Sequence, residues 1–278
     1  MLVWACIAPH GGELIPELAQ GNLDRMAVTR DAMAALGSRC RASRPDTIVV
    51  LTPHGIQAPD YLTVSACETA EGALQSDCGA SVTADFVVNV ELAESISERG
   101  AAAGHPVLPI GFADADHNLL PFQLDWGSLV PLWFMGAGWD PRPRIVVLCP
   151  SRSLPRQTLL DFGRKLAMAC EENDARIALV CSADQGHGHD AAGPYGFAPE
   201  SAEYDSAYVR AVRGDSLHDL LEWDAEWIDC AMADSYWQTL ILHGAILQSP
   251  MSPELLSYEA PTYFGMACVA YHRKDAGL

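Results

Sequence analysis

Four histidines in this chain follow apolar runs that are typical of buried strands. His10, His54, His187 and His189 each have a glycine beside them, and a residue without a Cβ leaves room for a bound group. Neutral imidazole is a common ligand for iron and zinc, and its usual pKa near neutrality also suits proton transfer. The pattern predicts a metal centre with histidine ligands and a histidine nearby that moves protons.

Each histidine, taken alone, is better explained as a loop imidazole bonded to a backbone carbonyl. The occurrence of histidine after three separate strands favours a shared site instead. Two histidines and one carboxylate on one side of Fe(II) would leave three coordination positions open for a substrate and oxygen.

The elements that would position these histidines alternate along the chain. Strands are predicted in four continuously apolar runs, LVWACIA (2–8), DTIVVLTP (46–53), PRIVVLCP (143–150) and ARIALVCS (175–182); such runs are typical of a parallel sheet covered on both faces. Helical spacing occurs in residues 22–41 and 156–171. The chain after residue 200 is mostly helical, and a last strand is expected within TYFGMACVAYHR (262–273).

This alternation predicts an α/β fold, a single domain over residues 1–278 with a central, largely parallel mixed sheet flanked by helices. Residues 56–142 are ambiguous, because strand-like YLTVSAC and helix-like VELAESISERG stand among many glycines and prolines. Ligands of such sheets bind at the carboxyl ends of the strands. The three histidine-bearing segments should therefore meet there.

Composition excludes several classes of partner. The chain has 17 basic and 36 acidic residues, a formal charge of −19, which repels phosphate backbones and anionic lipid surfaces. We expect no nucleic-acid partner and, without an apolar run of about 18 residues, no membrane span. Nine cysteines without a CxxC pair, and an N-terminus without a basic leader region, suggest reduced thiols and a cytoplasmic protein.

Five stretches together resemble the class III extradiol ring-cleavage dioxygenases, a superfamily that includes the protocatechuate 4,5-dioxygenase β-subunit and the Memo-like proteins. They are APHGGELIPEL (8–18), RPDTIVVLTPHG (44–55), LDWGSLVPLWFM (124–135), VCSADQGHGHDAAGPYGFAPESAEYD (180–205) and EWIDCAMADSYWQTLILHGAI (226–246). Their order and spacing, more than any single motif, carry the resemblance.

The resemblance implies a set of metal ligands. The family's first and second ligand histidines match His10 and His54. The third ligand is Glu in ring-cleaving members, whereas Memo-like proteins have Cys near that place. Counting back from the G-A-I of the last helix gives Asp234, with Glu226 and Asp229 as alternatives. Asp234 is also placed to be the N-cap of the following helix.

The family's catalytic histidine, in an S-[GD]-x-x-H stretch, matches His187, and His189 competes for the same role. One position departs from the family: many members have D-H-G where this chain has Asp-Trp-Gly, so Trp126 replaces a histidine of the pocket. His117 lies nearby in sequence and is a candidate substitute. Trp126 would either stack on an aromatic substrate or pack in the core, and we favour the core.

The implied function is non-haem Fe(II)-dependent cleavage of a catechol- or aminophenol-type ring with O2. Two alternatives stay open: a Memo-like metal-binding regulatory protein without ring cleavage, and a Zn2+-dependent lyase or hydrolase on the same site. An anionic substrate would need positive charge in the pocket of this acidic protein, yet no basic cluster stands out in the sequence. A homodimer is a family-level expectation.

Overall fold

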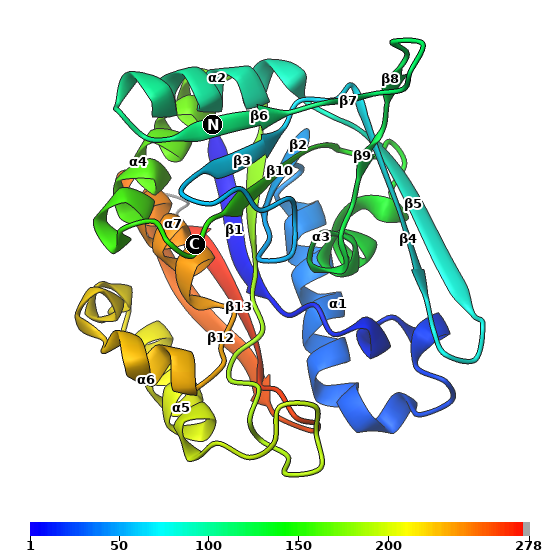
Figure 1. Cartoon of the computed structure of the whole chain (residues 1–278), viewed down its shortest axis with the longest axis vertical. Coiled ribbons are helices and arrows are strands. Elements are labelled where there is room, and N and C mark those ends of the chain that lie inside the picture. Colours follow the sequence, from blue (N-terminus) through cyan, green and yellow to red (C-terminus); the bar gives the residue numbers. More distant parts are fainter. Residues whose placement is uncertain (275–278) are drawn as a thin grey trace.

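Eight strands form the central sheet in the order β12-β13-β1-β11-β2-β10-β3-β6. The structure is a computed structural model, and residues 1–274 are described (Figure 1). The strands of this sheet are β1 (Leu2–Ala8), β2 (Thr47–Leu51), β3 (Leu62–Ser65), β6 (Val107–Ile110), β10 (Arg144–Pro150), β11 (Ile177–Ser182), β12 (Met251–Glu259) and β13 (Met266–Arg273).

The centre of the sheet is parallel. β1 pairs with β11, β11 with β2 and β2 with β10, all in parallel register. Nearly every residue of these four strands is buried, which explains why they read as continuous apolar runs. Antiparallel pairing joins β13 to β1, β12 to β13 and β3 to β10. The predicted α/β class with a largely parallel mixed sheet is confirmed.

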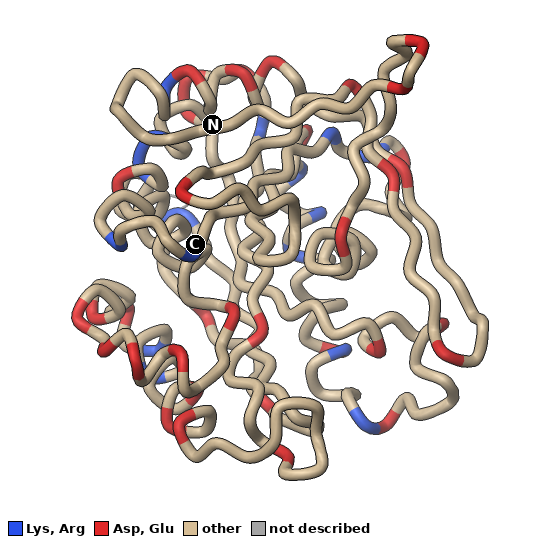
Figure 2. The backbone as a smooth tube through the Cα atoms, viewed as in Figure 1, with Lys and Arg blue, Asp and Glu red and all other residues tan. Residues whose placement is uncertain are grey.

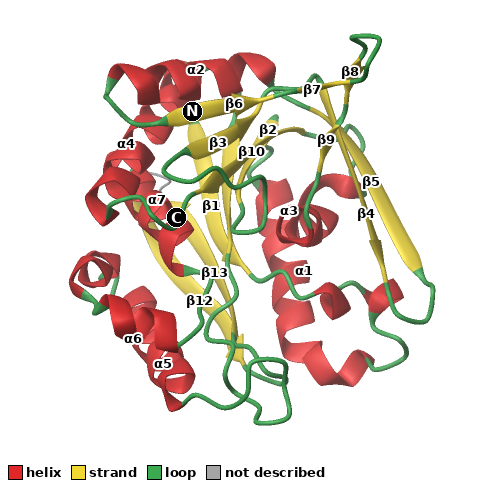
Figure 3. Cartoon of the chain, in the orientation of Figure 1, coloured by secondary structure: helices red, strands yellow, loops and turns green. Residues whose placement is uncertain are grey.

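Helices cover both faces of the sheet (Figure 3). α2 (Val90–Ala102), α4 (Arg156–Glu172), α5 (Pro199–Arg213) and α7 (Tyr236–Gln248) contribute to one apolar core, with α6 (Ala225–Cys230) beside α5. α1 (Ala27–Ala42) and α3 (Trp126–Leu132) contribute to the core on the other face. In the described part of the chain, no helix is long and apolar enough to span a membrane.

The ambiguous region contains a projecting arm. β4 (Thr69–Gln75), β5 (Ser81–Val87) and β9 (Phe122–Gln123) form a small sheet that contacts α3, and β7 (Phe112–Ala113) pairs with β8 (Leu119–Leu120). The sequence did not predict β4, β5 or β12. Buried and exposed positions alternate along β4 and β5, and β12 is mostly half-buried. These strands therefore lack the continuous apolar run by which the central strands were recognised.

Acidic residues lie on elements throughout the molecule in Figure 2, in keeping with the excess of 36 acidic over 17 basic residues.

Candidate active site

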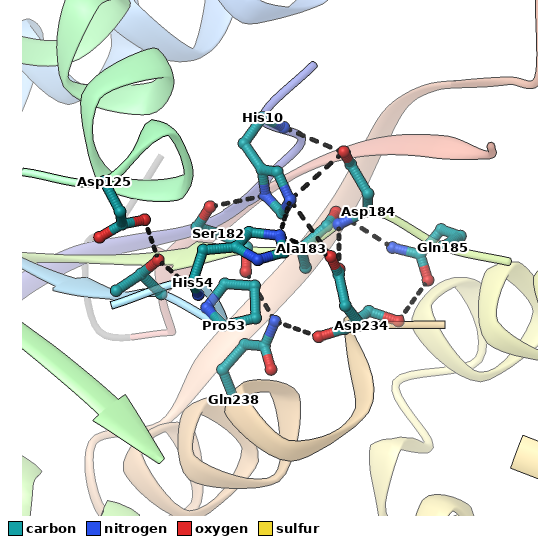
Figure 4. Close-up of polar contacts among 12 residues, drawn as sticks. His10, Pro53, His54, Asp125, Ser182, Ala183, Asp184, Gln185, Asp234 and Gln238 are labelled. Carbon is teal, nitrogen blue, oxygen red and sulfur yellow. Dashed lines mark hydrogen bonds and ion pairs between the residues drawn. The ribbon is translucent and has the colours of Figure 1, made fainter. Parts of the chain in front are cut away.

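The carboxyl ends of β1, β2 and β11 deliver the polar residues of one site (Figure 4). His10 follows β1, His54 follows β2 and Asp184 follows β11, and the three strands are neighbours in the sheet. Asp234 reaches the same place from the turn before α7. The predicted meeting of strand ends is therefore what positions the site.

Three donor atoms of this site lie close together. His54 Nε2 lies 3.0 Å from Asp234 Oδ2 and 3.1 Å from His10 Nε2, and His10 Nε2 lies 3.3 Å from Asp234 Oδ2. At bond lengths of about 2.1 Å, neighbouring donors lie about 3.0 Å apart around an octahedral metal and about 3.4 Å apart around a tetrahedral one. The spacing of these donors therefore suits one shared metal ion.

Further hydrogen bonds orient the donors. His10 Nδ1 lies 2.9 Å from Ser182 Oγ, which leaves Nε2 to face the other two residues. The Asp184 backbone N–H donates to Asp234 Oδ1 at 3.0 Å, and the His10 backbone N–H donates to Asp184 Oδ1 at 3.0 Å. Partners of this kind fix the orientation of metal ligands.

The charges of the site are coupled. Burial lowers the pKa of His10, but the carboxylates of Asp184 and Asp234 raise it by more, to about 9. Burial would raise the pKa of Asp234, yet His10 and His54 hold it well below its usual range. Burial raises the pKa of Asp184. Asp234 is thus an ionised carboxylate that needs a cationic partner, either the protonated imidazole or a metal ion.

The structure distinguishes between the three candidate carboxylates by position. Asp234 is buried beside the two histidines, whereas Glu226 and Asp229 are exposed on α6. The N-cap of α7 is Ser235, and both carboxylate oxygens of Asp234 are engaged at the histidine site. Asp234 therefore does not act as the cap of this helix.

A cavity of about 240 Å³ opens beside these residues. It is bordered by His10, Gly11, Gly12, Glu13, Arg25, Met26, His54, Trp126, Asp184, His187, Tyr195, Thr262, Tyr263 and Phe264. The His187 ring stacks on Phe264, with centroids 5.6 Å apart, and meets the edge of Tyr195 at 5.7 Å. Two histidines of the donor group and an aromatic wall thus share one small cavity.

The two candidate proton-transfer histidines have different surroundings. His187 borders the cavity, whereas His189 is not among the residues that border it. His189 Nε2 lies 2.8 Å from the buried Asp205 Oδ2, which also accepts a hydrogen bond of 2.6 Å from the Tyr258 hydroxyl. The geometry therefore favours His187 for contact with a bound molecule. His189 instead links the segment after β11 to Asp205 on α5.

Our expectation that Trp126 packs in the core was wrong. The residue is 48% exposed, borders the cavity and stacks on His54, with ring centroids 4.2 Å apart. It occupies the first position of α3, and burial begins only at the next residue. His117 does not take the place of the missing histidine, because it lies exposed in the turn between β7 and β8, outside the residues that border the cavity.

Two residues of the site, Arg25 and Asp184, were not predicted from the sequence. Arg25, in the 3-10 turn Leu23–Met26 before α1, brings a positive charge to the cavity and lies 3.7 Å from Glu13. Only the path of the loop after β1 brings it there. Asp184 stands next to the histidine-rich stretch, so its chemistry was visible in the sequence, but its contact with His10 was not.

Comparison with known proteins shows to which family the chain belongs. A family model described as the catalytic LigB subunit of aromatic ring-opening dioxygenase matches residues 5–268. The chain therefore belongs to this family, as its motifs predicted.

Individual relatives are distant. The chain is 24% identical to Protein CA_C1420 of Clostridium acetobutylicum over 91% of its own length and 54% of the relative's. It is 25% identical to 3,4-dihydroxyphenylacetate 2,3-dioxygenase of Escherichia coli over 56% of its length and 55% of the relative's. The chain thus spans about half the length of the curated relatives it matches.

The fold also matches a solved structure. The crystal structure of uncharacterized protein JW3007 from Escherichia coli K12 aligns with a TM-score of 0.64 at 22% identity, over 96% of this chain and 99% of that one. At this identity the likeness supports the fold alone.

Proposed function

We propose that this protein is a non-haem Fe(II)-dependent extradiol dioxygenase that opens the ring of a catechol- or aminophenol-type substrate with O2. The observation that carries the proposal is the convergence of His10, His54 and Asp234 at the edge of a cavity with aromatic walls. Membership of the LigB family supports it.

The donor set suits ferrous iron. Two imidazoles and one carboxylate, with donor atoms all within 4.8 Å of one another, are the ligands that non-haem Fe(II) oxygenases use on one side of the ion. When bound, Fe(II) supplies redox activity and open coordination positions for oxygen chemistry on the substrate. Zn2+ accepts the same donors, so the identity of the metal belongs to the proposal.

The remaining roles fall to side chains of the cavity. In the proposal, His187 accepts a proton from a ring hydroxyl of the substrate and returns one as the ring opens, because an imidazole can do both near neutral pH. Phe264 and Tyr263 border the same space and limit the entry of water. Arg25 supplies the positive charge that an anionic substrate requires in a protein of charge −19.

The test is oxygen uptake by anaerobically prepared, Fe(II)-loaded protein offered catechols and aminophenols. We expect uptake together with a ring-opened chromophore, and loss of both, with loss of bound iron, in His10→Ala and Asp234→Ala. Asp229→Ala is the matched control, since this exposed carboxylate lies on α6 and its removal should leave iron and activity unchanged.

Three results would contradict parts of the proposal. Activity retained in Asp234→Ala would show that another residue completes the site. Full iron binding without oxygen uptake on any substrate of the panel would favour a metal-binding role without ring cleavage. Turnover supported by zinc and not by iron would favour a lyase or hydrolase.

A further inference from the structure

We propose that Trp126 selects flat aromatic rings for this cavity, with one face of its indole covering His54 and the other offered to the ring of the ligand. The inference rests on the proposed function and concerns the position at which this chain departs from its family. It is carried by the contacts that hold Trp126 against His54 and by the exposure of the rest of the indole.

Hydrogen bonds join the first turn of α3 to the loop that carries His54. Asp125 caps α3 by accepting the Ser128 N–H at 3.0 Å, and the same Oδ1 accepts the Thr52 hydroxyl at 2.6 Å. Thr52 Oγ1 in turn accepts the backbone N–H of His54 at 3.2 Å. A side chain at the first position of α3 is therefore held in a fixed relation to His54.

Gly127 permits the close approach of these two segments. A Cβ at this position would lie 2.6 Å from Thr52 Oγ1 and 3.3 Å from His54 Cδ2, so a larger residue would push α3 away. With glycine there, the Trp126 and His54 rings stack at a centroid distance of 4.2 Å and an interplanar angle of 27°. Asp125 and Gly127 thus set the position of the indole between them.

The indole keeps free surface on the cavity side. Trp126 is 48% exposed although it stacks on His54, and it borders the same cavity as Tyr263 and Phe264. Those two rings pack against each other at 4.9 Å, whereas in the described part of the chain the ring contacts of Trp126 are confined to His54. An aromatic ligand that reaches the donor group would complete the stack.

The chemistry of indole differs from that of the family's imidazole at this place. Indole presents a broad π face that stacks with other rings. Its N–H donates a hydrogen bond but cannot accept or shuttle a proton. The position therefore recognises ring shape and leaves proton transfer in this cavity to His187.

The experiment measures binding without turnover. The full chain, loaded with redox-inert Zn2+, is titrated calorimetrically under anoxia with 4-nitrocatechol, a flat aromatic chelator, and with acetohydroxamate, a chelator without a ring. We expect Trp126→Leu to weaken 4-nitrocatechol binding by about 2- to 10-fold, the range of one lost ring stack. Acetohydroxamate affinity should stay unchanged, and Trp126→Phe should restore most of the selectivity.

Zinc content and thermal melting show whether each variant is folded and loaded. The matched control is Tyr61→Leu, because Tyr61 is an aromatic residue of similar exposure (44%) that does not border the cavity. Equal 4-nitrocatechol affinities in wild type and Trp126→Leu would overturn the proposal. So would an equal loss for both chelators, or a wild-type protein that binds neither. Because this readout uses zinc, an absence of ring cleavage with iron would refute the proposed reaction separately.

Discussion

At the scale of single residues, the site combines two buried carboxyl groups with few cations. Asp184 and Asp234 lie buried beside His10, and Arg25 is the permanently charged cation that borders the cavity. Arg25 has a loose partner in Glu13, at 3.7 Å, and its side chain is 42% exposed. It is therefore available to an anionic group on a ligand.

Replacement of Arg25 by Gln should raise KM for a catechol that carries a carboxylate by about three- to fivefold, because a half-exposed ion pair contributes up to about 1 kcal/mol. KM for an uncharged catechol should not change. The measurement compares 3,4-dihydroxybenzoate with 4-methylcatechol in steady-state oxygen uptake.

Arg213→Gln, which removes an exposed charge at the end of α5, should affect neither substrate. An equal rise of KM for both catechols in Arg25→Gln would mean that the arginine shapes the cavity rather than pairing with the substrate.

At the scale of elements, α7 carries a buried titratable group away from the site. His243 is buried at 6% exposure, and within the described residues neither ring nitrogen has a hydrogen-bond partner. Burial, then the neighbouring His218 and Arg164, lower its pKa to about 4, although Asp215 acts in the opposite direction. Protonation of His243 is thus much easier in the unfolded chain than in the folded one.

This difference predicts a pH-dependent stability. The unfolded chain binds the His243 proton below its ordinary pKa near 6.5, whereas the folded chain binds it only near pH 4. The contribution is therefore complete above pH 6.5 and is lost as the pH falls toward 4, by about 2–3 kcal/mol. Urea unfolding measures the free energy of unfolding at pH 7.5 and at pH 4.5. Between these pH values, His243→Gln should lose about 2–3 kcal/mol less of this free energy than the wild type.

His117→Gln is the control, because this imidazole is exposed in the turn between β7 and β8. It should follow the wild-type pH dependence. Identical pH dependence in wild type and His243→Gln would show that His243 is not held neutral in the fold.

At the scale of the whole molecule, the proposed metal joins segments that are far apart in the chain. His10, His54 and Asp234 span more than two hundred residues, and a ligand that binds only the folded state stabilises it by mass action. Metal at about 100 times its Kd should add about 2.7 kcal/mol, which for a chain of this length raises Tm by about 5 °C.

Calorimetric scans of metal-loaded and chelator-treated protein would measure this shift. In Asp234→Ala the shift should vanish, and in Asp229→Ala it should persist. An unchanged Tm in the wild type would contradict a metal site that couples these three segments. Homodimerisation and the cytoplasmic location stay predictions at this scale.

Much of the fold and part of the site could be predicted from the sequence. The four central strands were recognisable because each is buried on both faces, and their order of appearance placed His10 and His54 at the strand ends. Family motifs pointed to Asp234 and His187. β12 and the β4–β5 arm were missed, because half-exposed strands leave only a weak alternating pattern.

Only the tertiary structure decided which residues share the cavity. It showed Asp234 beside the histidines while Glu226 and Asp229 are exposed, and it placed Trp126 on His54 instead of in the core. It also brought Arg25 to the cavity. The physical reason is that sequence patterns record the burial of neighbouring residues, whereas these contacts depend on how loops and helices pack across the ends of the sheet.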